Sequence, residues 1–330
     1  MPEAGLKSRL VEELAAFIEA ASLTAGNSTA INPGHRQAFH WPPPSPSYRY
    51  HLPKSAWSSS ACFSAHGEEF FVEVAETKYG VFGRSPSTWH EARGKDVAEM
   101  LKNLKAAAEP LFRRQVLIAT TIGKSGRFTG SLSQLEPIDL IKLLYCPDRD
   151  VANDAHIEIE THASWHIFGP ALIEIIRDRK HPNRRSAQWC VLDLFEDLDS
   201  FCDTPEMREE AVRAIRDLIW DAEDDYARTV FKAGVVLGGH MPAEIGGPVL
   251  LECLNTPSKV GRRSAIHGLF HVVEWEPSMK DTISQALAEC GARESHPQLC
   301  DFALQMARDI AAGNYDHVQE PMFPEELVQR

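Results

Sequence analysis

The stretch GPALIEIIRDRKHPNRRSAQWCVLDLFE occupies residues 169–196, and GPVLLECLNTPSKVGRRSAIHGLFHVVE occupies residues 247–274. The two stretches align without a gap at an offset of 78 residues, so that the Gly-Pro pairs, the Arg-Arg-Ser-Ala runs and the closing glutamates coincide. Each contains two apolar helical segments separated by a turn that carries a proline. Self-similarity at a fixed offset predicts a repeat architecture built from helical hairpins.

The offset of 78 residues corresponds to two units of about 39 residues, and a second alignment supports a repeat of similar length. A shift of 35 residues places the apolar run 138–141 on 173–176 and Pro147 on Pro182. Less regular helix pairs are expected at 95–123, 207–239 and 279–312. A lone hairpin cannot bury its apolar side, and stacking against its neighbours solves that problem. The sequence therefore predicts five or six stacked hairpins.

The turn proline, the arginine pair and the small residue after it resemble HEAT repeats, including the bacterial PBS-lyase HEAT-like group. The resemblance covers about 180 to 220 residues. It implies a mainly α protein, a right-handed α-solenoid of five to six HEAT-like helical hairpins with a small N-terminal α+β element. Relatives of this kind include scaffolds, phycobilin lyases, DNA-alkylation glycosylases and toxin-immunity proteins, so the resemblance implies a fold more specifically than a function.

The expected domains are an N-terminal part (residues 1–94), the repeat array (95–312) and a C-terminal tail (313–330). The first part opens with an amphipathic helix at 6–20. A segment rich in proline, serine and glycine follows at 21–53, either as a linker or as an ordered wrap. Its aromatic residues favour the wrap, and they are Trp41, Tyr48 and Tyr50.

Strands are expected between residues 57 and 93. Phe70, Val72 and Val74 alternate with Phe71, Glu73 and Ala75, which predicts a strand. A turn is expected at 76–78, and a third strand is expected to end near Trp89. We expect this small element to pack on the first helices of the array.

The charge is unevenly distributed along the chain. The net charge is −13; residues 1–150 hold 17 Lys and Arg against 16 Asp and Glu, whereas residues 151–330 hold 17 against 31. Such a field disfavours nucleic acid and anionic membranes and favours basic partners. Solubility alone would also explain it. The chain has neither an apolar run of about 20 residues nor a signal-peptide pattern at its start, so a cytoplasmic location is expected.

The seven cysteines are odd in number, scattered and without a CxxC pair. Most lie within apolar helical patterns, which indicates buried free thiols in a reducing compartment. Neither a zinc cluster nor a cofactor is expected.

A Gly-Lys-Ser run at residues 123–125 suggests a phosphate-binding loop, but that motif needs a glycine where Ile118 stands and a preceding strand. A helix end at Gly123 is favoured instead. The pairs at 184–185 and 262–263 place arginines where a helix could bind phosphate. An ion pair with an acid of the neighbouring repeat is the favoured alternative.

His267, His271 and Glu274 share one helix side, on a stripe expected to lie off the core, and could hold a metal ion. His162 and His166 repeat the spacing at a position that is not equivalent in the alignment. The His-Glu dipeptides of HEAT-like di-iron hydroxylases are missing from the matched repeats. No metal is therefore expected.

The acidic stretch 193–225 holds 13 carboxylates without the spacing of a calcium loop, which indicates a solvated or partner-binding surface. In α-solenoids the second helix of each hairpin usually lines the concave surface. Projecting the stripe of the later repeat onto the earlier ones predicts an acidic groove with aromatic contacts. Its residues are Asp154, Glu158, His162, Trp189, Asp193, Glu196, Asp197, His267, His271, Glu274 and Trp275.

These features favour a non-enzymatic scaffold or adaptor that holds a basic protein or peptide in the acidic groove. Two alternatives stay open through the resemblance: a phycobilin lyase-like, chromophore-handling protein, and an immunity protein that neutralises a basic toxin. The glycosylase branch is disfavoured because it needs a basic groove. No catalytic residue is predicted.

Overall fold

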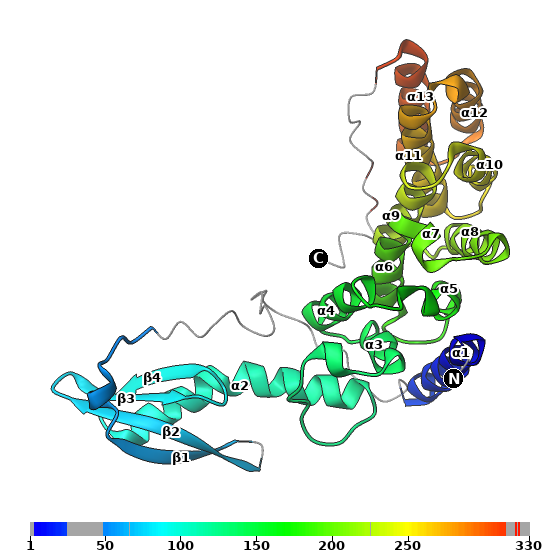
Figure 1. Cartoon of the computed structure of the whole chain (residues 1–330). Helices are drawn as coiled ribbons and strands as arrows, with labels where there is room; N and C mark the ends of the chain where they lie inside the picture. The colour runs from blue at the N-terminus through cyan, green and yellow to red at the C-terminus, as the bar shows by residue number, and fades with distance from the viewer. Residues whose placement is uncertain are drawn as a thin grey trace. The chain divides into compact units, whose positions relative to one another are not determined.

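The structure is a computed structural model that describes residues 3–24, 49–65, 67–224, 226–314, 321 and 323. It is mainly helical and includes one four-stranded antiparallel sheet (Figure 1). The chain forms two compact units: a sheet unit of residues 33–135, and a helical unit that combines residues 1–32 with 136–330. Most of the proline-rich segment, including Trp41 and Tyr48, lies outside the described residues.

The sheet is a meander in which each strand pairs with the next along the chain. Its strands are β1 (Ser59–Ala65), β2 (Glu68–Thr77), β3 (Gly80–Ser85) and β4 (His90–Gly94), preceded by the short helix η2 (Lys54–Ala56). Phe70, Val72 and Val74 are buried while Phe71 is exposed, as their alternation predicts. Trp89 lies in the turn between β3 and β4 with φ of 58°, so no strand ends there.

The residues before β1 cover part of one side of the sheet. The Tyr50 ring meets Phe82 edge-on at 5.0 Å, and the Tyr50 backbone N–H donates to the Glu91 carboxylate at 2.9 Å. The Arg84 guanidinium stacks on Trp57 at 4.4 Å. This part of the expected wrap is therefore ordered against the sheet.

Helix α2 (Val97–Thr121) packs on the other side of the sheet. Its buried residues Met100, Leu104 and Phe112 join Phe63 and Phe70 in one core. The hairpin predicted at 95–123 is therefore wrong, because the segment is one continuous helix. The helix continues through Pro110, which does not end it, and the sheet takes the place of a second helix.

Helix α2 ends as predicted at Gly123, whose φ of 79° suits glycine. The Gly123 N–H donates to the Thr120 carbonyl at 3.0 Å, and the Lys124 N–H donates to the Ala119 carbonyl at 2.8 Å. The Gly-Lys-Ser run thus caps a helix and follows no strand.

The helical unit consists of short helices that contact one another in a recurring order. They are α1 (Glu3–Thr24), α3 (Pro137–Leu143), α4 (Arg149–Glu160), α5 (Gly169–Arg177), α6 (Arg184–Leu194), α7 (Leu198–Phe201), α8 (Pro205–Trp220), α9 (Ala227–Gly239), α10 (Ala243–Cys253), α11 (Lys259–Trp275), α12 (Lys280–Arg293) and α13 (Pro297–Ala312). The 3₁₀ turns of the chain after α2 are η3 (Leu132–Gln134), η4 (Trp165–Ile167), η5 (Phe195–Asp197) and η6 (Pro277–Met279).

Two series of contacts run through this unit. Helix α4 contacts α6, α6 contacts α9, α9 contacts α11, and α11 contacts α13. The helices that precede them in each pair form a second series, in which α5 contacts α8 and α8 contacts α10. Helix α1 packs on α3 and α5 and buries Leu10 and Leu14. We call α4, α6, α9 and α11 the second helices.

Helices α9 and α11 approach each other very closely because small residues line their contact. A Cβ atom on Gly238 would overlap the backbone of Gly268, and one on Gly234 would overlap Ser264. The Ser264 hydroxyl donates to the Val230 carbonyl at 2.5 Å.

Arginine–glutamate pairs join successive parts of the helical unit. Arg185 reaches Glu223 at 3.0 Å, and Arg262 reaches Glu294 at 2.5 Å. Arg185 and Arg262 therefore pair with acids further along the chain, as the favoured alternative predicts, whereas Arg263 donates to the Pro321 carbonyl.

Five cysteines are buried, Cys62 is exposed and Cys300 is half-buried. Burial raises the pKa of Cys190, Cys202 and Cys253 to about 12, so these thiols stay protonated at neutral pH. No helix in the described part of the chain is long and apolar enough to cross a membrane.

Candidate binding face

Helix α9 brings predicted residues of α6, η5 and α11 together, and they belong to a surface that we call the second-helix face. It comprises the predicted residues on α4, α6, η5 and α11 together with Arg228, Phe231 and Lys232 on α9. Asp154 and Glu158 lie half-buried on α4. His162 lies beyond the end of that helix, where its Nδ1 accepts the Ser164 N–H at 3.1 Å. The projected stripe therefore ends with Glu158 on this helix.

Trp189 on α6 forms an aromatic contact at the centre of the face. The Arg228 guanidinium lies 4.6 Å from its ring centroid, and the Lys232 ammonium lies 5.6 Å away. Both cations come from α9, and they attract the electron-rich face of the indole. Trp189 is half-buried by these side chains.

The acids next to Trp189 pair with Lys232, which also comes from α9. The Lys232 ammonium contacts Asp193 at 2.6 Å and also pairs with Glu196. His156 Nε2 lies 3.5 Å from the other Asp193 oxygen, and burial lowers the pKa of His156. Partial burial alone would lower the pKa of Lys232, but hydrogen bonds to the two carboxylates outweigh it and leave that pKa raised. One lysine thus partly neutralises the two carboxylates at the predicted acidic centre.

On α11 the two histidines and Glu274 form a chain of contacts. His267 Nε2 lies 3.0 Å from His271 Nε2, and His271 Nδ1 lies 2.7 Å from Glu274. His267 is only 4% exposed because the Phe231 ring of α9 lies 4.6 Å away. The expectation that this stripe lies off the core is therefore wrong at His267, since the glycines of the α9–α11 contact bring Phe231 over it.

Three groove residues are exposed enough to reach a partner. Trp275, at the end of α11, is 74% exposed, and its neighbour Glu274 and Asp197, at the end of η5, are exposed as well. Among the described residues, no group of three or more His, Cys, Asp or Glu side chains is arranged to hold a metal ion.

The projection missed Arg228 and Lys232, although a signal for them was present in the sequence. Trp189, Arg228 and His267 follow one another at 39-residue intervals, half of the 78-residue offset. Asp193, Lys232 and His271 do the same. The helix pair at 207–239 matches its neighbours less exactly than they match each other, so the projection from α11 onto α6 does not include it. Its α9 residues occupy the middle of the face.

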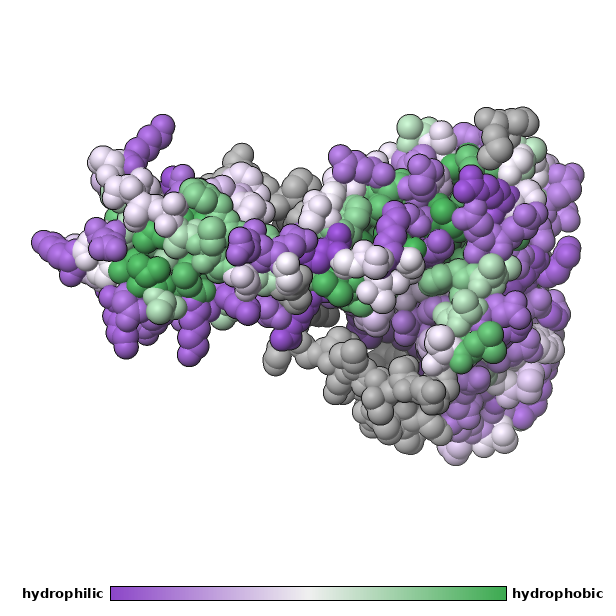
Figure 2. All heavy atoms as spheres, turned by 90° about the horizontal axis from the view of Figure 1, so that it is seen from below, coloured by the Kyte–Doolittle hydropathy of each residue, from purple (hydrophilic) through white to green (hydrophobic). Residues whose placement is uncertain are grey.

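In Figure 2, hydrophobic side chains gather on part of the sheet unit, and hydrophilic and hydrophobic side chains are both visible on the helical unit. Among the described residues of the sheet unit, the exposed large hydrophobic ones are Phe71, Tyr79 and Trp89. No protein-family model matches the chain, and no curated protein or solved structure is detectably similar to it.

Proposed function

We propose that the helical unit is an α-solenoid of HEAT-like hairpins and that the protein is a non-enzymatic scaffold or adaptor that holds a basic protein on its second-helix face. The contacts from α4 through α6, α9 and α11 to α13 support the solenoid, since equivalent helices of successive hairpins touch. The 39-residue spacing of side chains on this face supports it independently.

The observation that carries the function is the composition of the face. Trp189 and the exposed Trp275 are aromatic anchors of the kind that dominate protein interfaces. Six of the eleven predicted positions are carboxylates, and α9 contributes two cations, Arg228 and Lys232. An acidic excess therefore persists after Lys232 has paired with Asp193 and Glu196, and it favours a basic partner.

Charge reversal tests this proposal most sharply at acids that do not pair with Lys232. The triple variant Glu158→Lys, Asp197→Lys and Glu274→Lys changes α4, η5 and α11. A matched control reverses three exposed acids on α8 and α10, namely Glu206, Glu209 and Glu244. Both variants change the net charge equally, so a difference between them reports position and excludes a general charge effect.

Immobilised wild-type protein is incubated with cell extract, and the retained proteins are identified by mass spectrometry after elution with salt. We expect the wild type and the control triple to retain the same basic protein, and the face triple to lose it. Equal retention by both triples, or retention of only acidic proteins, would contradict the proposal. Circular dichroism melts of all three proteins establish that each is folded.

A further inference from the structure

A separate contact involves the C-terminal segment, of which Pro321 and Phe323 are described. Phe323 is 0% exposed. The Lys259 ammonium lies 5.1 Å from its ring centroid, the Arg263 guanidinium lies 4.9 Å away, and the His296 ring meets it edge-on at 4.9 Å. Two cations of α11 and the histidine before α13 thus surround one phenylalanine.

The backbone of the segment is held as well. Arg263 Nη1 donates to the Pro321 carbonyl at 2.7 Å, and Arg263 itself is only 4% exposed. A hydrogen bond to a backbone carbonyl does not depend on the side chain of the bound residue. The pocket around the ring, in contrast, selects an aromatic side chain two residues later. This division between backbone and side-chain recognition is typical of peptide-binding sites.

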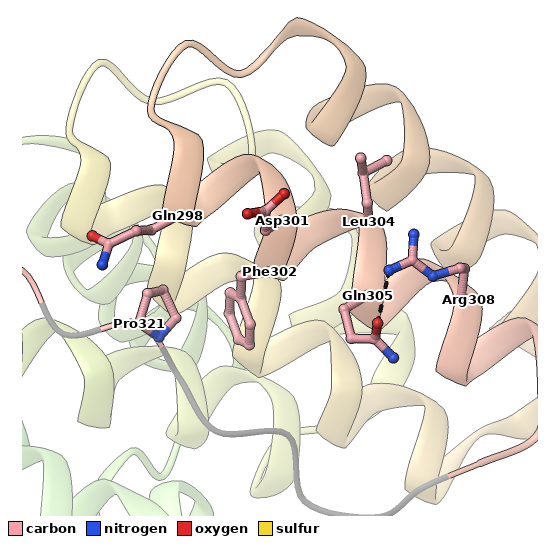
Figure 3. A pocket seen from close by; sticks show the side chains of 7 residues that line it. All are labelled: Gln298, Asp301, Phe302, Leu304, Gln305, Arg308 and Pro321. Atoms are coloured by element: carbon pink, nitrogen blue, oxygen red, sulfur yellow. Dashed lines mark hydrogen bonds between the residues drawn. The ribbon is translucent and has the colours of Figure 1, made fainter.

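A hollow of about 470 Å³ continues beside this contact, and Pro321 forms part of its wall (Figure 3). Its other lining residues belong to α13 and are Gln298, Asp301, Phe302, Leu304, Gln305 and Arg308. Arg308 donates to Gln305 at 2.7 Å along one side. The surface next to Pro321 therefore has room for further residues of a bound segment.

We propose that Lys259, Arg263 and His296 form a binding pocket for an extended peptide anchored by phenylalanine, and that the C-terminal segment of this chain is its intramolecular ligand. The pocket residues that meet the ring are charged or polar, unlike the aliphatic residues that fill the interior of the helical unit. Helices α12 and α13 pack on each other directly, and α11 contacts α13, so these contacts do not depend on Phe323.

The attachment of the C-terminal segment to the same chain has a measurable consequence. A segment attached to the same chain is present at an effective concentration of about a millimolar, so it suppresses binding of the same sequence added from outside. Substituting Phe323 removes the anchor and should open the pocket. Binding of the separate peptide to a chain that lacks Phe323 would therefore reveal the pocket directly.

The test uses a fluorescein-labelled peptide of residues 317–330 and full-length protein, with binding followed by fluorescence anisotropy. We expect the Phe323→Ala chain to bind the peptide at least about tenfold more tightly than the wild type does. The same peptide carrying Phe323→Ala should bind neither chain. Lys259→Met, introduced into the Phe323→Ala chain, should weaken binding several-fold by removing one cation from the ring.

Equal affinity of the wild-type and Phe323→Ala chains would overturn the proposal, as would absence of binding to a Phe323→Ala chain that melts like the wild type. If that chain is unfolded at the assay temperature, the titration is repeated on Phe323→Leu, which keeps apolar volume in the pocket. Its affinity should then exceed that of the wild type, and no gain would overturn the proposal. These outcomes are independent of the second-helix face, because no variant used alters it.

Discussion

At the scale of single residues, the pairs that join successive hairpins differ in burial. The Glu294 side chain is 2% exposed and meets Arg262, whereas Glu252 is 51% exposed and meets Arg216. Burial alone would raise the pKa of Glu294, but hydrogen bonds from Arg262 and from the backbone outweigh it and hold that pKa below its usual value. The buried carboxylate therefore depends on its arginine.

Arg262→Met should lower the free energy of unfolding by about 3 kcal/mol, because it leaves a buried charge without its partner. Arg216→Met, the matched exposed pair, should cost less than about 1 kcal/mol. Urea denaturation at pH 7 measures both. Equal losses would show that burial of Glu294 does not set the strength of its pair.

His181 is a buried titratable group near the N-terminal helix. Its ring stacks on Phe17 at 5.4 Å and lies 4.3 Å from the Tyr145 ring. Burial lowers its pKa to about 4, against the opposing influence of Asp178. The folded protein therefore holds this histidine neutral, while the unfolded chain protonates it near its ordinary pKa of about 6.5.

This difference makes stability depend on pH in a defined direction. The contribution of His181 is complete above pH of about 6.5 and is lost as the pH falls towards about 4, because the unfolded state binds the extra proton. Between pH 7.5 and 5 the loss should be about 2 kcal/mol. Urea unfolding at both values, with His181→Gln as the comparison, measures it. If the free energy of unfolding of His181→Gln depends on pH as strongly as that of the wild type, other groups cause the effect.

At the scale of elements, the close contact between α9 and α11 depends on Gly238 but not on the adjacent Gly239. A Cβ on Gly238 would overlap the carbonyl of Gly268, whereas the nearest atom to a Cβ on Gly239 is His271 Cβ at 3.7 Å. The two positions are adjacent on one helix, so substituting them separates the effect of packing from that of helix propensity.

Gly238→Ala should destabilise the protein by about 2 to 3 kcal/mol, because backbone atoms must move apart. Gly239→Ala should be neutral or stabilise it by less than about 1 kcal/mol, since alanine favours a helix over glycine. Thermal denaturation of the two variants compares them directly. A harmless Gly238→Ala would mean that α9 and α11 are not in this close contact.

The sequence alone predicts the helix pairs from 137 to 312 well, because their apolar spacing and turn prolines are local signals. It fails at 95–123, where a helical pattern cannot reveal whether its partner is another helix or a sheet. It also places His267 outside the core, because burial there depends on Phe231 from a different helix. These errors arise from tertiary contacts, which no local pattern encodes.

The 39-residue period contains more information about the face than the first projection used. It identifies Arg228 and Lys232 as the counterparts of Trp189 and Asp193. That these cations neutralise part of the acidic stripe follows only from the packing of α9 against α6. The sequence therefore predicts where the face lies better than it predicts the charge of that face.

At the scale of the whole molecule, the sheet unit has a core of its own. Phe63, Phe70 and Phe112 pack together, and the Arg127 guanidinium lies 4.9 Å from the Phe70 ring. A fragment of residues 49–130 should therefore fold alone and melt cooperatively in circular dichroism, with the modest stability of a small domain. A gradual, featureless melt would show that the sheet needs the rest of the chain.

We propose that the second helices of successive hairpins present one continuous face that binds a protein. Site-specific photo-crosslinking to the retained partner tests this proposal, with a benzophenone amino acid placed at Asp197 or Trp275 on the face, and at Glu209 or Ile245 on α8 and α10. We expect crosslinked adducts from Asp197 and Trp275 and none from Glu209 and Ile245. Adducts that form equally from all four positions, or only from the last two, would contradict it.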